Sequence, residues 1–127
     1  MQDVEINQES AMGYTGGDRD LYLSILEVFR GEKDETQKKL NAFLQAEDWN
    51  NYEIIVHALK GNALMVGCTA FSELSKSLEF ACKDIMAGND VEQKVKYVKE
   101  THPQYIEFYD ALAEKTKGIA CSVHSNN

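Results

Sequence analysis

The sequence predicts an all-α protein, an up-and-down antiparallel four-helix bundle with an additional N-terminal helix laid across it. Apolar residues recur at spacings of three and four along most of the chain, which is the period of an amphipathic helix. The chain has a single proline, and short breaks rich in glycine and aspartate separate the periodic stretches. No stretch alternates like a strand between hairpin turns. Since the breaks are short, consecutive helices are expected to be antiparallel neighbours.

Length and composition narrow the classes of function. The chain has 127 residues, which suits one domain, and a net charge of −8, which argues against duplex nucleic acid or an anionic membrane as a partner. The N-terminus lacks the features of a secretory signal, and no apolar run is long enough to span a membrane. The spacing of the cysteines fits neither a zinc clip nor a disulfide framework, so we expect a reduced, cytoplasmic protein without a metal site; these are Cys68, Cys82 and Cys121.

The first half of the bundle is predicted from caps and breakers. A short helix is expected before Gly16, and the first long helix should run from its N-cap Asp18 to Arg30, where Gly31 ends it. A capping box formed by Asp34 and Gln37 should then open a second helix. The apolar face expected for the first long helix comprises Leu21, Ile25, Val28 and Phe29, and that of the second Leu40, Phe43 and Leu44.

The next two helices have clear boundaries. Asp48 caps a helix that ends at Gly67, and Thr69 begins another that ends at Gly88. The core face expected for the first of these helices comprises Trp49, Tyr52, Ile55, Val56, Leu59, Ala63 and Val66. The core face expected for the second comprises Phe71, Leu74, Leu78, Ala81 and Ile85.

The last helix is predicted to begin after Asp90. Its apolar stripe continues through Pro103, which favours one long helix kinked near Thr101 and His102 over two separate helices. Gly118 should end the helix, giving a single domain over 1–118 and a flexible tail over 119–127, where Cys121 is expected to be an exposed thiol and His124 inert. The stripe comprises Val91, Val95, Val98, His102, Tyr105, Tyr109 and Leu112. His102, on this stripe, is expected to be a partly buried histidine with satisfied hydrogen bonds.

The stretch 57–67, HALKGNALMVG, is the part of the chain that suggests chemistry. At about 100° per residue, His57 lies opposite the core face, with Lys60 and Gly61 one turn further on. An imidazole is a nucleophile at neutral pH, an ammonium neutralises a phosphoryl group, and a glycine clears its approach. Glu79 on the next helix could accept the Nδ1–H of His57 and leave Nε2 free to attack.

The same outer face predicts a docking surface around His57, formed by Glu53, Ile54, Leu64 and Lys83, with Ser75 expected nearby. Simpler interpretations remain open at this point. His57 could be an ordinary surface histidine, and Gly61 could mark a close contact between helices. The N-terminal segment could also bury Ile54 and Leu64.

This stretch resembles the histidine-containing phosphotransfer (HPt) domain of bacterial two-component phosphorelays. The resemblance rests on the run from Val56 to Gly67, on a leucine-rich segment that follows, and on a lead-in that begins at Gly17 and Asp18. The leucine-rich segment contains Phe71, Leu74, Leu78 and Glu79, and the lead-in continues with Leu21, Tyr22, Leu26 and Phe29. Val56 and Asn62 depart from the usual small residues at their positions, and Asn62 could either donate a hydrogen bond near the phosphate or lie at the edge of the core.

The resemblance implies roles for individual residues. His57 would be the phosphoacceptor, Lys60 and Gly61 would adjoin the phosphoryl group, and Glu79 would orient the histidine. The chain would then be a monomeric phosphocarrier without catalytic activity or a cofactor of its own. Its expected partners are response-regulator receiver domains, which would supply Mg²⁺, and a hybrid sensor histidine kinase.

Three rival interpretations come from other classes. The chain could be a helical adaptor without phosphorylation, or a metal-binding bundle that uses His57, His102 and carboxylates, although the paired Glu-x-x-His motifs of di-iron bundles are missing. It could also be a detached phosphotransfer module of a chemotaxis-type kinase. We expect a free-standing carrier, because the tail contains no linker or kinase sequence.

Overall fold

The computed structural model describes residues 4–125, with side chains described up to Ile119. All its regular elements in this range are helical, which confirms the all-α prediction. A short helix α1 (Gln8–Met12) and a 3₁₀ turn η1 (Gly13–Thr15) precede four long helices. These are α2 (Arg19–Gln45), α3 (Trp49–Val66), α4 (Thr69–Ala87) and α5 (Val91–Ser125). None of the helices within the described range has the length and apolar character needed to cross a bilayer.

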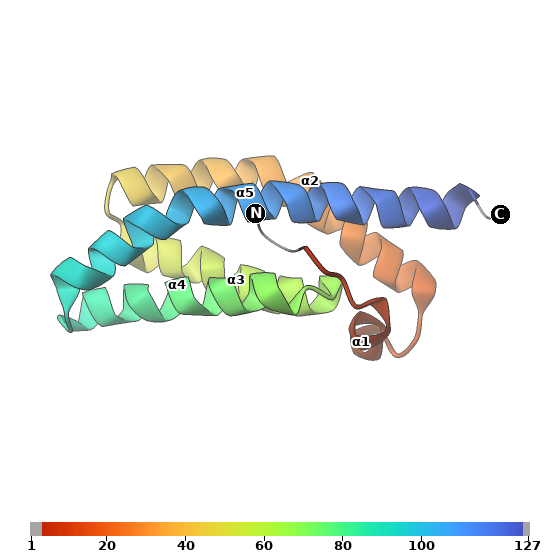
Figure 1. Cartoon of the computed structure of the whole chain (residues 1–127), viewed down its shortest axis with the longest axis horizontal. Coiled ribbons are helices and arrows are strands. Elements are labelled where there is room, and N and C mark those ends of the chain that lie inside the picture. The colour runs from red at the N-terminus through yellow and green to blue at the C-terminus, as the bar shows by residue number, and fades with distance from the viewer. Residues whose placement is uncertain (1–3, 126–127) are drawn as a thin grey trace.

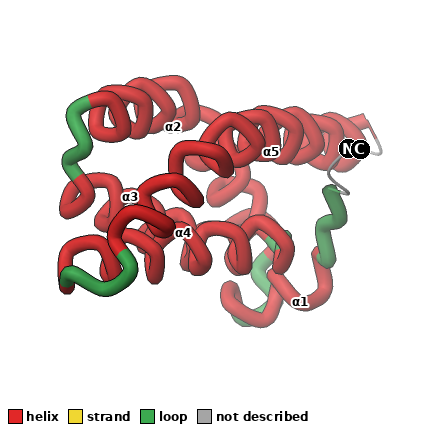
Figure 2. Tube along the Cα trace, turned by 60° about the vertical axis from the view of Figure 1, so that its left-hand side comes forward, coloured by secondary structure: helices red, strands yellow, loops and turns green. Residues whose placement is uncertain are grey.

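The four long helices lie side by side, and successive ones run in opposite directions (Figure 1). α3 packs against α2 and α4, and α5 packs against the same two helices from the other side. The α1 segment lies beside one end of the bundle in both views and contacts α2 and α3 (Figures 1 and 2). The N-terminal helix expected from the sequence is therefore this single short turn.

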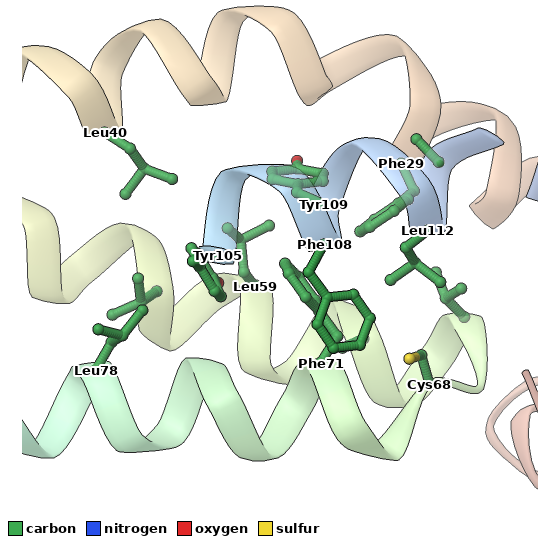
Figure 3. Close-up of a cluster of buried hydrophobic side chains, with 14 of the residues drawn as sticks. Phe29, Leu40, Leu59, Cys68, Phe71, Leu78, Tyr105, Phe108, Tyr109 and Leu112 are labelled. Atoms are coloured by element: carbon green, nitrogen blue, oxygen red, sulfur yellow. The ribbon is translucent and has the colours of Figure 1, made fainter. Parts of the chain in front are cut away.

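An aromatic cluster fills the centre of the bundle (Figure 3). Phe71 from α4 stacks on Tyr105 from α5 with ring centroids 4.8 Å apart. Phe108 and Tyr109 approach the same Phe71 ring at 5.2 and 5.4 Å, and Phe29 of α2 packs on Tyr109 at 5.2 Å. Because such rings bury large apolar areas and favour offset or edge contacts, this cluster joins α2, α4 and α5.

The break predicted at Gly31 is wrong, because α2 continues from Arg19 to Gln45. Gly31 lacks the positive φ of a helix-ending glycine. The Asp34–Gln37 pair does not form a capping box either. The amide of Gln37 donates to Asp110 Oδ1 at 3.0 Å and to the carbonyl of Ile106 at 3.3 Å. Contacts with α5 thus replace the local cap that the pair would make in isolation.

Of the apolar face predicted for the first part of α2, Phe29 is buried as expected, but the rest of the prediction is wrong. Tyr22, Leu26 and Phe29 are buried, whereas Leu21 and Val28 are exposed and Ile25 is half-buried. Tyr22 fixes this orientation, since its hydroxyl donates to the carbonyl of Val66 at 2.7 Å. The buried face is therefore rotated from the predicted one, which leaves Leu21 and Val28 exposed and Ile25 at the edge of the core.

Helix α5 runs without interruption through Pro103, as predicted, and bends in its first half (Figure 1). The predicted end at Gly118 is wrong, because the helix continues to Ser125. Gly118 is exposed and does not adopt the left-handed conformation of a terminator. The expectations for Cys121 and His124 concern side chains outside the described part, as does the end of the tail at 126–127.

Gly67 joins the N-terminal segment to the end of α3. It ends the helix with φ +104°, as predicted, and its carbonyl accepts a hydrogen bond from the amide of Asn7 at 2.8 Å. A Cβ on this residue would lie 2.6 Å from the carbonyl oxygen of Asn7. Glycine is therefore required here both by the backbone conformation and by the close approach of another chain segment.

His102 forms a buried polar link between three helices. Its Nδ1 lies 2.8 Å from the hydroxyl of Tyr52 in α3, and its Nε2 lies 2.7 Å from Oδ1 of Asn41 in α2. Since the oxygen of Asn41 can only accept, Nε2 carries the proton and Nδ1 accepts from Tyr52. The expectation of a buried, satisfied histidine is confirmed, and burial lowers the pKa of His102 below its usual value.

We predict that His102 makes the fold less stable in mild acid. The neutral form belongs to the folded state, so its contribution is complete above the unfolded pKa of about 6.5 and is lost as pH falls toward the lower folded pKa. One such group changes the free energy of unfolding by at most about 1.4 kcal/mol per pH unit. Urea unfolding between neutral pH and pH 5 should show a smaller decline for His102→Gln, which keeps a donor and an acceptor. Equal declines for the two proteins would contradict the prediction.

Candidate functional site

Helix α3 presents His57 to solvent. Asp48 caps the helix through a hydrogen bond from the amide of Asn51 at 3.2 Å, and burial of Tyr52, Val56 and Leu59 fixes its rotation. His57 then points away from the core, with 61% of its side chain exposed. The helical register predicted from the sequence is thus the register of the structure.

Glu79 of α4 is the centre of the site, and its side chain is only 1% exposed. One carboxylate oxygen, Oε1, accepts from Lys60 Nζ at 2.7 Å. The other, Oε2, lies 2.5 Å from His57 Nδ1 and 3.2 Å from Lys83 Nζ. The structure therefore brings together four residues that the sequence singled out, from two helices.

The charge of Glu79 is maintained by these contacts. Burial by itself would raise the pKa of the carboxyl group, but the hydrogen bonds from Lys60, His57 and Lys83 outweigh it and lower the pKa to about 2. The carboxylate is therefore ionised at neutral pH. The hydrogen bond to Glu79 in turn raises the pKa of Lys83.

An ionised Glu79 determines the tautomer of His57. A carboxylate has no proton to donate, so Nδ1 of His57 must donate the hydrogen bond at 2.5 Å. In the neutral imidazole, the proton on Nδ1 leaves Nε2 with its lone pair. The site therefore presents an oriented nitrogen nucleophile at the protein surface.

Gly61 lies one helical turn from His57 on α3 and has no packing role. A Cβ added to it would meet no atom within 4 Å, so the alternative of a close contact between helices does not apply. The residue has ordinary helical geometry and is exposed. The missing side chain leaves space one turn from His57, on the side open to a partner.

The predicted docking residues surround His57. Ile54 is 54% exposed, Glu53 and Leu64 are half-buried, and Lys83 reaches Glu53 at 3.7 Å as well as Glu79. Within the described part of the chain, the N-terminal segment therefore does not bury Ile54. Ser75, which was expected near this surface, is instead buried, and its hydroxyl lies 2.6 Å from that of Tyr105.

The sequence interpretation missed two features of the site. Ser72 of α4 donates to the carbonyl of Lys60 at 2.9 Å and so ties α4 to the helix turn that carries the lysine. An apolar groove of about 390 Å³ also lies between α2 and the C-terminal part of α3. Its lining includes Leu21, Ile25, Val28, Asn62 and Met65. The sequence did contain a signal for this groove, because α2 carries more apolar residues than a single core-facing side requires.

Comparison with known families agrees with this geometry. The sequence pattern of the Hpt domain family matches residues 24–121, which include the whole site. The chain therefore belongs to the Hpt domain family and is a histidine phosphotransfer module of the kind used in two-component phosphorelays, where Hpt domains interact with receiver domains and kinases. Neither the curated proteins nor the solved structures contain a match to the chain.

Two glycine substitutions, one within α3 and one at its C-cap, should have opposite effects on stability. Gly61→Ala should raise the free energy of unfolding by about 0.5–1 kcal/mol, because alanine is the better helix former and meets no neighbour. Gly67→Ala should lower it by about 1–3 kcal/mol, because its φ of +104° strains any side chain. Thermal and urea unfolding measure both changes. A destabilised Gly61→Ala protein would contradict the absence of a packing role for Gly61.

Proposed function

We propose that this chain carries phosphoryl groups on Nε2 of His57 between the receiver domains of a two-component phosphorelay. The observation that carries the proposal is the hydrogen bond from Nδ1 of His57 to the buried Glu79 carboxylate, because it leaves the exposed Nε2 unprotonated. Membership of the Hpt domain family supports the same assignment.

The transfer needs no general base on this chain. The Nε2 lone pair of His57 attacks the phosphorus of an aspartyl phosphate on a receiver, and the Nε2–P bond forms as the P–O bond to the aspartate breaks. The electron pair of that bond returns to the receiver's aspartate as a carboxylate. The proton on Nδ1 stays in its hydrogen bond to Glu79 and stabilises the phosphorylated ring. The reverse sequence delivers the group to a second receiver.

Two lysines compensate the incoming negative charge. Lys60 and Lys83 both contact Glu79, which holds their ammonium groups next to His57. Phosphoryl transfer depends mainly on positioning and charge neutralisation, so cations held in place beforehand lower its barrier. The space beside Gly61 admits the phosphoryl oxygens. Mg²⁺ is supplied by the receiver, which leaves this chain a carrier without a cofactor or catalytic activity of its own.

The receiver docks over the exposed side of α3. Ile54 and Leu64 flank His57, and the groove between α2 and α3, which Met65 lines, offers a further apolar area toward the end of α3. Glu53 and Lys83 offer charges of both signs at the edge of this surface. Apolar contacts with a polar rim are typical of interfaces between proteins, and the exposed Leu21 and Val28 fit such a role. The proposed carrier is a monomer in a reducing, cytoplasmic compartment, in keeping with the free thiols of Cys68 and Cys82.

Phosphotransfer from a radiolabelled receiver tests this proposal. In the presence of Mg²⁺, the wild-type chain should take up label that survives alkali and is lost in acid, as expected of a phosphohistidine. His57→Gln should take up none. Gly61→Ala should accept label at least about tenfold more slowly, because its methyl group obstructs the phosphoryl group; this corresponds to about 1.4 kcal/mol in the barrier.

His102→Gln is the matched control, since it alters a histidine that lies in the core rather than on the docking face. Its labelling should equal that of the wild type. Label retained by His57→Gln, or label lost only from His102→Gln, would overturn the assignment of His57.

A further inference from the structure

Three groups capable of binding a metal converge at the side of His57 that faces Glu79. Glu53 and His57 lie one turn apart on α3, and Glu79 faces them from α4. Among the described residues, these three side chains form a cluster in which the ligating atoms lie within 4.8 Å of one another. His102 is not part of it, because that ring is held in the core by Tyr52 and Asn41.

The donor atoms suit Zn²⁺. Imidazole nitrogen and carboxylate oxygen are its ordinary ligands, at about 2.0–2.2 Å, and three protein ligands with one open position form a common arrangement. Ligand atoms in such a shell lie about 3–4 Å apart. All three ligand atoms already lie within 4.8 Å of one another, so binding requires the His57–Glu79 pair to open from 2.5 Å and the three atoms to settle around the ion. The exposed side chain of His57 can make the opening movement. Mg²⁺ is a poorer match, since it favours oxygen ligands and octahedral geometry.

A positive charge already occupies the position between the two carboxylates. Lys83 Nζ lies 3.2 Å from Oε2 of Glu79 and 3.7 Å from Oε1 of Glu53. The side chain of Lys83 is 51% exposed, so it can swing into solvent without leaving a cavity. Lys60 binds the other oxygen of Glu79, Oε1, and continues to compensate the buried carboxylate when Oε2 is engaged elsewhere.

We propose that Glu53, His57 and Glu79 bind one Zn²⁺ ion in place of the Lys83 ammonium, and that the bound ion prevents phosphorylation of His57. The block on phosphorylation rests on the proposed function. Nδ1 faces Glu79, so it is the nitrogen that binds the ion, giving up its proton and donating its lone pair. The neutral ring then carries its proton on Nε2, which has no lone pair left to attack phosphorus. Zinc therefore removes the nucleophile without unfolding the site.

Calorimetric titration of the metal-free chain with zinc chloride tests the site itself. The wild type should bind one ion, and His57→Gln and Glu53→Gln should each weaken binding at least about tenfold, or about 1.4 kcal/mol. Lys83→Ala should lower the Kd, because the competing ammonium is gone; adventitious binding to surface carboxylates and histidines would not respond in this way. Cys121→Ala/His124→Ala should bind as the wild type does, and far-UV circular dichroism confirms that each variant is folded.

Absence of zinc binding by the wild type, or equal binding by His57→Gln, would overturn the site. Labelling of His57 by a phosphorylated receiver, with and without zinc, tests the block on phosphorylation separately. Equal labelling of the zinc-loaded and metal-free chains would overturn the block on phosphorylation. A metal-free chain that takes no label but still binds zinc through these residues would overturn the proposed function and leave the metal site standing.

Discussion

The site depends on one buried charge, the carboxylate of Glu79. A carboxylate removed from water is costly unless it is paired and hydrogen-bonded, and here Lys60, His57 and Lys83 supply the partners. These contacts join α3 to α4 and, at the same time, determine which nitrogen of His57 carries the proton. Because the partner groups come from both helices, the packing of α4 on α3 sets the chemistry of the exposed histidine. Loss of the carboxylate would leave two lysines and an imidazole without their shared partner.

The core and the site make different demands on α3. Tyr52, Val56, Leu59 and Ala63 face inward, and Ser72 of α4 anchors the carbonyl of Lys60. His57, Gly61 and Ile54 face outward, where they add little to the core but suit a protein partner. Gly61 shows the separation most clearly, since alanine would favour the helix there and nothing in the fold excludes it. A residue that weakens its helix without a packing reason is consistent with a functional requirement.

Much of the fold and of the arrangement around His57 was predictable from the sequence, because helix geometry is regular. Residues three and four apart on one helix must be neighbours, so the placement of His57, Lys60 and Gly61 followed from spacing. The caps at Asp18 and Asp48 and the terminators at Gly67 and Gly88 were also predicted correctly, since each acts through its own local backbone. Features that depend on contacts between residues far apart in the sequence were not predicted. Gln37 bonds to α5 instead of capping a helix, Tyr22 fixes the rotation of α2 through Val66, and the groove beside α3 arises from that rotation. The burial of Glu79 likewise depends on how α4 packs, which no local pattern specifies.

The central claim is that Glu79 holds His57 as the tautomer with a free Nε2, which the phosphoryl transfer requires and which bound zinc would reverse. Long-range ¹H–¹⁵N correlation NMR of the metal-free, unphosphorylated chain near pH 8 measures this directly, since protonated and unprotonated ring nitrogens have distinct ¹⁵N shifts. The account predicts a protonated Nδ1 and an unprotonated Nε2 for His57, and a mixture of tautomers once Glu79 is replaced by alanine. A wild-type His57 with its proton on Nε2, or with the two tautomers averaged as in Glu79→Ala, would contradict it.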